Sequence, residues 1–445
     1  MFIFSRERNV TSIGSIIFFL ICVLPGHLFA QPGVHFESGS TWEQLKEKAK
    51  AENKYLFVDC YASWCGPCNK MDTEVYPDTS VGAYLNNQFI SVKVQMDTTK
   101  QDDAIKQSWY SDAHALSVNY KINAFPCYLF FTPDGIIVHR GLGYQDPAAF
   151  IGLVKNALDP QKQYYTMLDN YKAGIKSYEM LPYLAERAKA FNDRGAADSM
   201  MVDYMHSYLD TQGEAAVCTR ENLRLAASFA IILSSGDKIF QICLRNPRLA
   251  DSAMHNKGFA KRLVNFVIGK EEIDPETALA RKETREPNWK KIDQHIRGKY
   301  GKSYAEENVA GGKIDWYRSV KNWSNYAKYL VIQMDMTGLA SRPNDPGERF
   351  VLNNIAWEVF KYSNDKNELE RAVAWSDWVV QGDSIPDGVH IDTKANLLYK
   401  LGRKDEALSL EVKAVEASPK IEVLAKEIAE NLEKMKQGEP TWPMR

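Results

Sequence analysis

Residues 55–68 read YLFVDCYASWCGPC, a nearly continuous apolar run that leads directly into two cysteines separated by a glycine and a proline. An apolar run of this length is typical of a central strand that is covered on both faces. Asp59 is the one polar residue that interrupts the run. The pattern predicts a buried strand at 55–62, with Cys65 and Cys68 just beyond its end and a helical pattern through Val75 after them.

Outward from this strand, helical patterns alternate with further apolar runs. Ser40 and Glu43 have the spacing of a capping box at the start of a helix. A Pro-Asp-Gly turn at 133–135 separates two strand-like runs and predicts a hairpin. A compact α/β layer fold is therefore expected. Its elements, in chain order, are a helix at 42–52, strands at 55–62, 89–96 and 127–131, a hairpin strand at 136–139 and a closing helix at 147–158.

Several motifs in this order resemble thioredoxins. Residues 58–68 resemble the active-site strand and loop of that family, and Phe125-Pro126 resembles its cis-proline loop. Lys93 falls where thioredoxins keep a lysine near a buried aspartate, and Gly143 fits the glycine before the last helix. The resemblance implies a thioredoxin-like domain over residues 31–159, with a central mixed sheet flanked by helices, close to the modules of exported thiol:disulfide interchange proteins.

The cysteine pair carries the expected redox chemistry. A thiolate attacks a disulfide, so an attacking cysteine needs a lowered pKa. Cys65 is expected at the first turn of a helix, where free backbone N–H groups and the helix dipole favour negative charge. Cys68, one turn later and expected to be less exposed, is predicted to resolve the mixed disulfide. Gly66 and Pro67 let the chain turn and begin the helix.

Asp59 and Lys93 are the predicted proton-handling residues. By resemblance, Asp59 is the buried carboxylate that takes the proton from Cys68, and Lys93 tunes its pKa. Burial independently raises a carboxylate's pKa towards neutrality. The alternative is a solvent-facing aspartate at the end of a strand.

The residues expected to face a substrate surround the pair. By resemblance, the loop of Phe125 and Pro126 faces the cysteines, and Trp64 covers the active-site loop, with plain packing as its alternative. Cys127 follows the proline where the family often has threonine, so a third thiol is expected there, either inert and buried or able to trap a side disulfide. Asn69 replaces a lysine common after the pair, which removes a positive charge beside Cys65.

No metal or other cofactor is expected beyond the redox pair. A structural zinc site needs four ligands, normally two CxxC pairs or a Cys/His combination, and this sequence has one pair and no His spacing of that kind. Of the five remaining cysteines, Cys22 lies in the signal-like segment at 1–30 and is expected to leave with it, and the other four are expected to be small buried apolar residues. They are Cys60, Cys127, Cys218 and Cys243.

Residues 1–30 have the pattern of a secretory signal. Arg6 and Arg8 precede an apolar run at 13–24, and Ala30 precedes a plausible cleavage point. The run is too short for a membrane anchor, which needs about 20 apolar residues. An exported protein without stable membrane insertion, in a bacterial periplasm, is expected. The formal net charge of −2 gives no indication of nucleic-acid binding, and the basic stretch at 281–302 is interpreted as a solvated helix face.

Beyond residue 159 amphipathic helical patterns replace strand-like runs. Residues 160–340 are expected to be helical without a recognisable repeat. In 341–437, Ala395, Gly402, Ala407 and Ala414 resemble the small and turn positions of a tetratricopeptide repeat, with Ala372 in a weaker copy. Residues 438–445 are a tail. Repeat arrays commonly present a concave face to another protein, so this region is expected to recruit partners.

Two functions remain open at this point. The first is an exported disulfide reductase or interchange enzyme acting on protein thiols and disulfides. A membrane interchange protein is then the implied electron donor, and an oxidase or isomerase is the alternative in the same class. The second is a helical binding scaffold in which the thioredoxin fold is a non-catalytic platform. The intact pair of Cys65 and Cys68 favours the enzyme.

Overall fold

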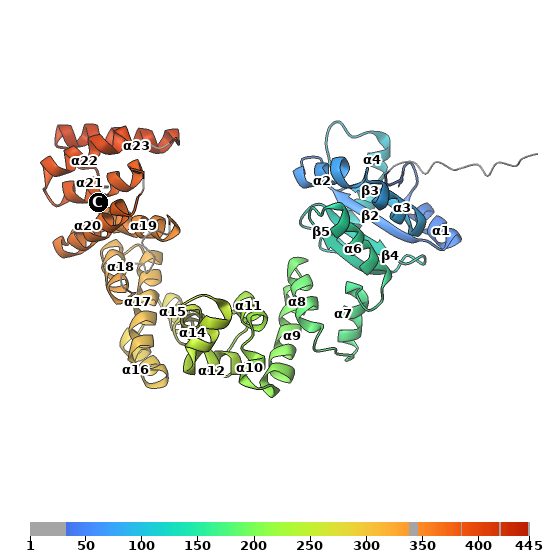
Figure 1. Ribbon diagram of the computed structural model, residues 1–445, viewed down its shortest axis with the longest axis horizontal. Helices are drawn as coiled ribbons and strands as arrows, with labels where there is room; N and C mark the ends of the chain where they lie inside the picture. The colour runs from blue at the N-terminus through green and yellow to red at the C-terminus, as the bar shows by residue number, and fades with distance from the viewer. Residues whose placement is uncertain (1–32, 338–345, 384, 418–419, 444–445) are drawn as a thin grey trace, which may run out of the picture. The chain divides into compact units, whose positions relative to one another are not determined.

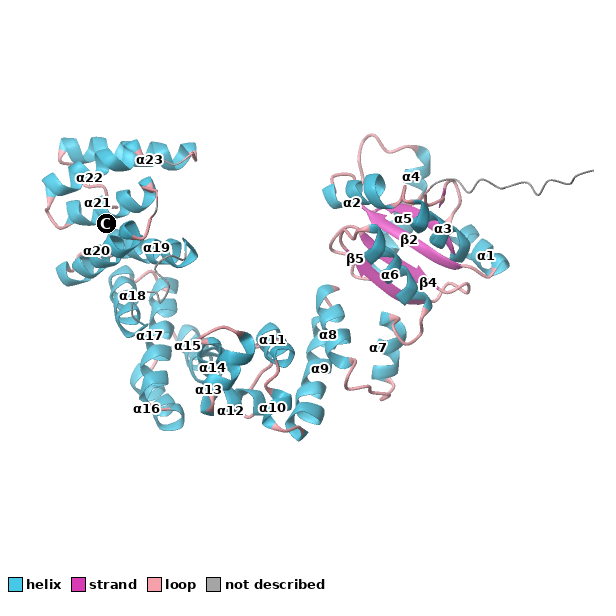
Figure 2. Ribbon diagram, viewed as in Figure 1, coloured by secondary structure: helices cyan, strands magenta, loops and turns pink. Residues whose placement is uncertain are grey.

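The computed structural model describes residues 33–337, 346–383, 385–417 and 420–443, so the predicted signal at 1–30 lies outside the described residues. The chain divides into two compact units, the first reaching to Ala197 and the second beginning at Asp198. The first contains the mixed sheet and the second is helical (Figures 1 and 2). The expected fold class, an α/β thioredoxin-like domain followed by an all-α region, is confirmed in these broad terms.

The sheet of the first unit has five strands in the order β1-β3-β2-β4-β5. Strands β1 and β2 run parallel to β3, whereas β4 is antiparallel to both β2 and β5. The hairpin strand is longer than predicted, because pairing with β4 continues until Leu142 lies opposite Cys127. The strands are β1 (Phe36–Glu37), β2 (Tyr55–Tyr61), β3 (Phe89–Gln95), β4 (Cys127–Phe131) and β5 (Ile137–Leu142).

Helices cover both faces of the sheet, which explains the apolar run in β2. Because side chains alternate along a strand, Val58 and Cys60 pack against one core and Phe57 against the other. The first core receives side chains from α1 (Trp42–Glu52) and α5 (Tyr110–Asn119), which follows α4 (Ala104–Ser108). The second receives them from a π-helix (Met71–Val75), which continues α2 (Gly66–Lys70), and from α3 (Thr79–Gln88) and α6 (Pro147–Leu158).

The first helix has the expected bounds but a different cap. Thr41 is the N-cap: its side chain accepts a hydrogen bond from the Gln44 N–H, and the Gln44 side chain accepts one from the Thr41 N–H. The predicted pair of Ser40 and Glu43 is therefore wrong by one residue. The capping residue must directly precede the first helical residue, Trp42, and that position belongs to Thr41.

The first unit continues past α6 into α7 (Tyr164–Lys172) and α8 (Leu181–Ala190), which are tied to the edge strand β5. The backbone N–H of Tyr164 donates to Nδ1 of His139, a buried residue of β5, over 3.0 Å. Burial lowers the pKa of His139 to about 4, assisted by the charge of Arg187. A neutral imidazole acceptor thus holds the start of α7 on the sheet.

Helices make up the second unit. Gly402, with a φ of 83°, separates α21 from α22, and Ala395, Ala407 and Ala414 are buried. Its longer helices are α11 (Arg220–Ser228), α12 (Lys238–Arg245), α13 (Pro247–Met254), α14 (Phe259–Ile268), α15 (Asp274–Lys282), α16 (Trp289–Tyr300), α17 (Lys302–Ser319), α18 (Trp323–Thr337), α19 (Pro346–Tyr362), α20 (Lys366–Gln381), α21 (Gly388–Lys400), α22 (Lys404–Glu416) and α23 (Glu422–Gln437).

Within the described ranges, every helix falls short of the length and apolarity that a bilayer crossing requires. In the basic stretch, Arg285 pairs with Glu276 and Arg297 with Asp293, as on an ordinary ion-paired helix surface.

Candidate active site

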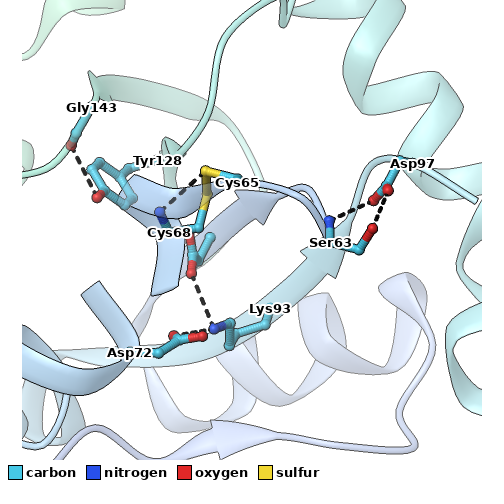
Figure 3. The surroundings of a disulfide bond; sticks show 9 residues. Ser63, Cys65, Cys68, Asp72, Lys93, Asp97, Tyr128 and Gly143 are labelled. Atoms are coloured by element: carbon cyan, nitrogen blue, oxygen red, sulfur yellow. Dashed lines mark hydrogen bonds and ion pairs between the residues drawn. A yellow bond between two sulfur atoms is a disulfide. The ribbon is translucent and has the colours of Figure 1, made fainter. Parts of the chain in front are cut away.

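Cys65 and Cys68 form a disulfide bond at the end of β2 (Figure 3), with an S–S distance of 2.05 Å. Both cysteines are buried, with exposed fractions of 2% and 3%, so the structure shows no marked difference in exposure between them. Ala62 belongs to the same buried cluster as the two cysteines, and Phe125 packs against that cluster. Gly66 and Pro67, in the turn between the cysteines, are exposed.

The local backbone stabilises negative charge on Cys65. Cys65 is the N-cap of α2, and its Sγ accepts a hydrogen bond from the Cys68 N–H over 3.1 Å. The first N–H groups of a helix have no intrahelical acceptor, and the helix dipole adds positive potential at this end. Pro67 lies in the first helical turn, where its missing N–H costs nothing. When the disulfide is reduced, Cys65 is thus the sulfur placed to carry a thiolate.

Asp59 is a buried carboxylate, with 1% of its surface exposed. It lies on the face of β2 opposite to Cys60 and opposite Tyr128 in the register of β4. Burial raises its pKa to about 6, although Lys93 and the Tyr76 hydroxyl both lower it. No donor lies within hydrogen-bond geometry of Asp59 Oδ1 among the residues that the structure describes. The solvent-facing alternative for this aspartate is therefore excluded by its burial.

Lys93 lies where the resemblance implies, next to Asp59. The two residues are paired in the parallel register of β2 and β3, and Lys93 Nζ is 3.8 Å from Asp59 Oδ2. The same ammonium group pairs with Asp72 (Figure 3) and lies 4.9 Å from the ring centroid of Tyr61. One cation therefore faces two carboxylates, of which only Asp59 is buried.

The proline loop lies against the cysteine pair. The Phe125–Pro126 peptide bond is cis, as predicted, and the Pro126 carbonyl accepts a hydrogen bond from the Gly143 N–H over 2.8 Å. Phe125 also meets the ring of Trp64 edge-on, at a centroid distance of 5.9 Å. Trp64 is 73% exposed. It therefore presents a large aromatic surface beside the disulfide and does not act as a packed core residue.

Cys127 and Cys60 are buried free thiols that lie directly opposite each other on β4 and β2. Burial raises the pKa of both thiols, and for Cys60 the neighbouring Cys127 adds to the effect. The structure thus supports the inert alternative for Cys127, because a thiol with a raised pKa forms little thiolate. The sequence patterns did not indicate that the two thiols are neighbours. Cys218 and Cys243 are buried free thiols as well.

Two acidic residues of the site were not predicted. Asp72 lies four residues after Cys68 on the same helical segment, a spacing that places both on one face and offered a usable signal. Asp97 follows β3 and accepts hydrogen bonds from the Ser63 N–H and hydroxyl, at 2.9 and 2.5 Å. It fixes the loop just before Trp64. Only the pairing of β2 with β3 brings Asp97 there, so no local pattern could have found it.

Among the described residues, the group with metal-ligating geometry consists of His206, Asp210 and Asp237, which belong to the second unit.

The thioredoxin-like domain family matches residues 42–158 of this chain. The thiol:disulfide interchange protein DsbD of Pseudoalteromonas atlantica is 31% identical over 119 residues, which are 26% of this chain and 18% of that protein. A thioredoxin-like protein of Synechocystis sp. is 34% identical over 98 residues, or 22% of this chain and 76% of that protein. Among solved structures, a DsbH oxidoreductase shares 20% identity, covers 31% of this chain and 92% of its own, and has a TM-score of 0.26.

A mixed five-stranded sheet with a CxxC disulfide at the end of its central strand and a cis-proline beside it defines a thioredoxin-type redox domain. Through that domain the chain belongs to the family of thioredoxin-like proteins. The domain is also related to thiol:disulfide interchange proteins. The chain spans about a fifth of the length of the DsbD relatives, so the likeness concerns one domain.

Proposed function

We propose that this protein is a thiol–disulfide oxidoreductase that reduces or exchanges disulfide bonds of protein clients through Cys65 and Cys68. The observation that carries the proposal is the disulfide itself, at a helix start where Cys65 Sγ accepts a backbone N–H, in the domain that carries the buried Asp59. A non-catalytic platform needs none of these features.

The reaction has two exchange steps. The Cys65 thiolate attacks one sulfur of a client disulfide, forms a mixed disulfide and releases the other client sulfur as a thiolate. The Cys68 thiol then loses its proton and attacks Cys65 Sγ, which releases the second client thiolate and forms the Cys65–Cys68 disulfide. Two electrons pass to the client, and the released thiolates take up two protons. The described state is the oxidised product of this sequence.

Asp59 is the proposed proton acceptor for Cys68, and Lys93 is proposed to tune the pKa of Asp59. A pKa of about 6 leaves Asp59 mostly ionised at neutral pH yet basic enough to take a proton. Lys93, 3.8 Å away, keeps that pKa from rising further. Trp64, Gly66, Pro67, Phe125 and Pro126 are the proposed client-facing residues.

No cofactor beyond the redox pair enters this mechanism. Each cycle consumes the Cys65–Cys68 dithiol, so a separate dithiol must restore it. We assign that role to a membrane thiol:disulfide interchange protein, and we place the reaction outside the cytoplasm, in a bacterial periplasm. The signal-like pattern at 1–30 and the relation to DsbD support this assignment.

Insulin reduction by residues 31–445, with dithiothreitol as donor, tests the proposal. We expect turbidity from the released insulin chains to appear sooner with the protein than without it, and a Cys65→Ser variant to lose the effect. A Cys218→Ser variant is the matched control, because that thiol lies in the other unit. Equal activity of wild type and Cys65→Ser would contradict an enzyme and leave the scaffold function.

The reduction potential of the pair decides the direction of exchange. A value near the −270 mV of thioredoxin supports a reductase, whereas a value about 100 mV more oxidising supports an oxidase or isomerase. Equilibration against glutathione and dithiothreitol measures it. The Cys-Gly-Pro-Cys sequence favours the reductase.

The helical residues 341–437 are proposed to recruit a client or partner through tetratricopeptide-like helix pairs. The buried Ala395, Ala407 and Ala414 and the turn at Gly402 support this reading. Deletion of residues 341–437 should then weaken reduction of a native client while leaving insulin reduction intact.

A further inference from the structure

Three side chains that play no part in the redox chemistry converge in the second unit. His206 lies in a π-helix (Tyr204–Tyr208), Asp210 in the 3-10 turn that follows it (Leu209–Thr211), and Asp237 directly precedes α12. His206 Nδ1 is 3.3 Å from Asp210 Oδ2 and 3.5 Å from Asp237 Oδ1. One ligand atom from each residue lies within 4.8 Å of the other two.

Asp237 is the residue that distinguishes this group from an ordinary surface cluster. An aspartate in its position normally caps the helix by accepting N–H groups of the first turn. Asp237 makes no such bond to α12. Only 2% of its surface is exposed, and no residue in the described part of the chain donates a hydrogen bond to its Oδ1 atom, although that atom faces His206 Nδ1. A carboxylate oxygen that is buried without a donor normally has a hydrogen-bond donor or a cation as its partner.

The outer oxygens of both carboxylates are fixed by the backbone. The Ser234 N–H donates to Asp237 Oδ2 over 2.6 Å, and the Lys238 N–H donates to Asp210 Oδ1 over 3.2 Å. These bonds leave Asp237 Oδ1 and Asp210 Oδ2 directed towards the imidazole. Hydrogen bonds to the far side of a ligand are the usual means of orienting residues that bind a metal.

The spacing of the ligand atoms indicates a coordination geometry. A tetrahedral ion with bonds of about 2.0–2.1 Å holds its ligand atoms about 3.3–3.4 Å apart, whereas cis ligands of an octahedral ion at the same bond length lie about 3.0 Å apart. The two separations from His206 Nδ1, 3.3 and 3.5 Å, are closer to the tetrahedral than to the octahedral value, and the three ligand atoms all lie within 4.8 Å of one another. One imidazole and two carboxylates leave a fourth position for water, as in catalytic zinc sites.

We propose that His206, Asp210 and Asp237 bind a divalent transition-metal ion, with Zn²⁺ as the preferred ion. Imidazole nitrogen favours zinc over magnesium or calcium. Half of the His206 side chain is exposed, which gives the ion a path from solvent. The nearby Lys238 ammonium does not occupy the position, because it donates to the backbone carbonyls of Asp210 and Gln212.

The competing explanation is a protonated His206 that forms ion pairs with both aspartates. It needs the same three side chains but predicts no specific affinity for a metal. A titration with Zn²⁺ alone therefore separates the two explanations.

The experiment uses untagged residues 31–445 with Cys65 and Cys68 oxidised, so that the thiols of the pair do not bind zinc. Calorimetry is expected to show one Zn²⁺ per chain with micromolar or tighter affinity. His206→Ala and Asp237→Asn are each expected to weaken it at least tenfold. His295→Ala is the matched control, because His295 also pairs with a carboxylate, Glu272 at 3.1 Å, but with a single one.

Cobalt supplies an independent readout of geometry. Co²⁺ at this site should give the intense visible absorption of a tetrahedral complex, and the band should be absent in His206→Ala. If Asp237→Asn loses its circular dichroism signal, Asp210→Asn takes its place. Unchanged zinc affinity in His206→Ala, or binding no tighter than millimolar in the wild type, overturns the proposal. Neither result bears on the redox function, which rests on the other unit.

Discussion

Lys93 lies directly opposite Asp59 on the neighbouring parallel strand, with its Nζ atom 3.8 Å from Asp59 Oδ2. Burial raises the pKa of Asp59 to about 6 and the lysine opposes that rise. The pKa of the proposed proton acceptor is thus set by two opposing contributions, burial and the charge of Lys93. Asp59→Asn removes the acceptor itself, and Lys93→Met removes the opposing charge.

Replacement of Asp59 by asparagine removes the proposed proton acceptor. We expect the rate of the second exchange step at pH 7 to fall on the order of 10²-fold, the size of general base catalysis. In the wild type that rate should decline as the pH is lowered through about 6, because Asp59 becomes protonated. Stopped-flow Trp fluorescence during oxidation of the reduced protein measures the step. Asp134→Asn, at an exposed turn, is the control, and a wild-type pH profile in Asp59→Asn would contradict the role.

The same substitution should stabilise the fold at neutral pH. The folded-state pKa of Asp59 is raised from 3.8 to about 6, so the folded protein binds this proton more tightly than the unfolded chain does. The free energy of unfolding therefore falls as pH rises from about 4 to about 6. Asp59→Asn lacks this loss and should be more stable at pH 7 by up to about 3 kcal/mol. Urea unfolding at pH 4 and 7 checks it, and an equal pH dependence in both proteins would count against it.

Lys93→Met should raise the pKa of Asp59, because it removes the charge that opposes the effect of burial. Without the ammonium group the pKa of Asp59 rises above 6, so the inflection in the rate of the second step shifts to higher pH. Lys48→Met removes a surface ion pair with Glu37 in the same domain and should leave the inflection in place. An unshifted inflection in Lys93→Met would show that the lysine has no part in tuning Asp59.

Trp64→Ala separates client binding from chemistry. Because Trp64 is 73% exposed and contacts Phe125 edge-on, its loss should change the free energy of unfolding by about 1 kcal/mol at most. We expect KM for insulin to rise while the rate with oxidised glutathione stays the same. A parallel loss with both substrates would place Trp64 in the redox step instead.

The burial of Glu411 should make the stability of the second unit depend on pH. Its side chain is fully buried in α22, and burial together with Asp392 raises its pKa above the ordinary 4.5. Asn396 and Asn431 donate to Asp392, whereas Glu411 has no donor among the described residues. The folded protein therefore keeps the proton, and stability falls as pH rises above about 4.5, by up to about 1.4 kcal/mol per pH unit.

Glu411→Gln should abolish that dependence and protect α22 at pH 8. Hydrogen exchange of α21 and α22, corrected for the intrinsic rates, measures the local opening. Glu433→Gln, on the exposed side of α23, is the matched control. The interpretation fails if the wild type and Glu411→Gln open equally from pH 5 to pH 8.

Much of the redox site was predictable because its signals are local. The apolar run of β2 requires cover on both faces, and the cysteine pair follows it in sequence. The cis proline at Pro126 and the lysine at 93 were predicted by resemblance to thioredoxins, and the structure places both beside the pair or its buried aspartate. The cap of α1 was misplaced because Ser40 and Thr41 are both good capping residues, and the backbone decides which one directly precedes the helix.

The sequence by itself determined the fold class and the position of the cysteine pair, since strand periodicity and motif spacing are properties of neighbouring residues. Asp59 was located by resemblance to thioredoxins, and its burial was decided by the tertiary structure. Only the tertiary structure decided that Asp72 shares Lys93 with Asp59, that Cys60 faces Cys127, and that Asp237 meets His206. These contacts depend on strand register and helix packing between distant segments. Such contacts are fixed by the burial of whole faces, and no single stretch of sequence records which residues will then lie opposite each other.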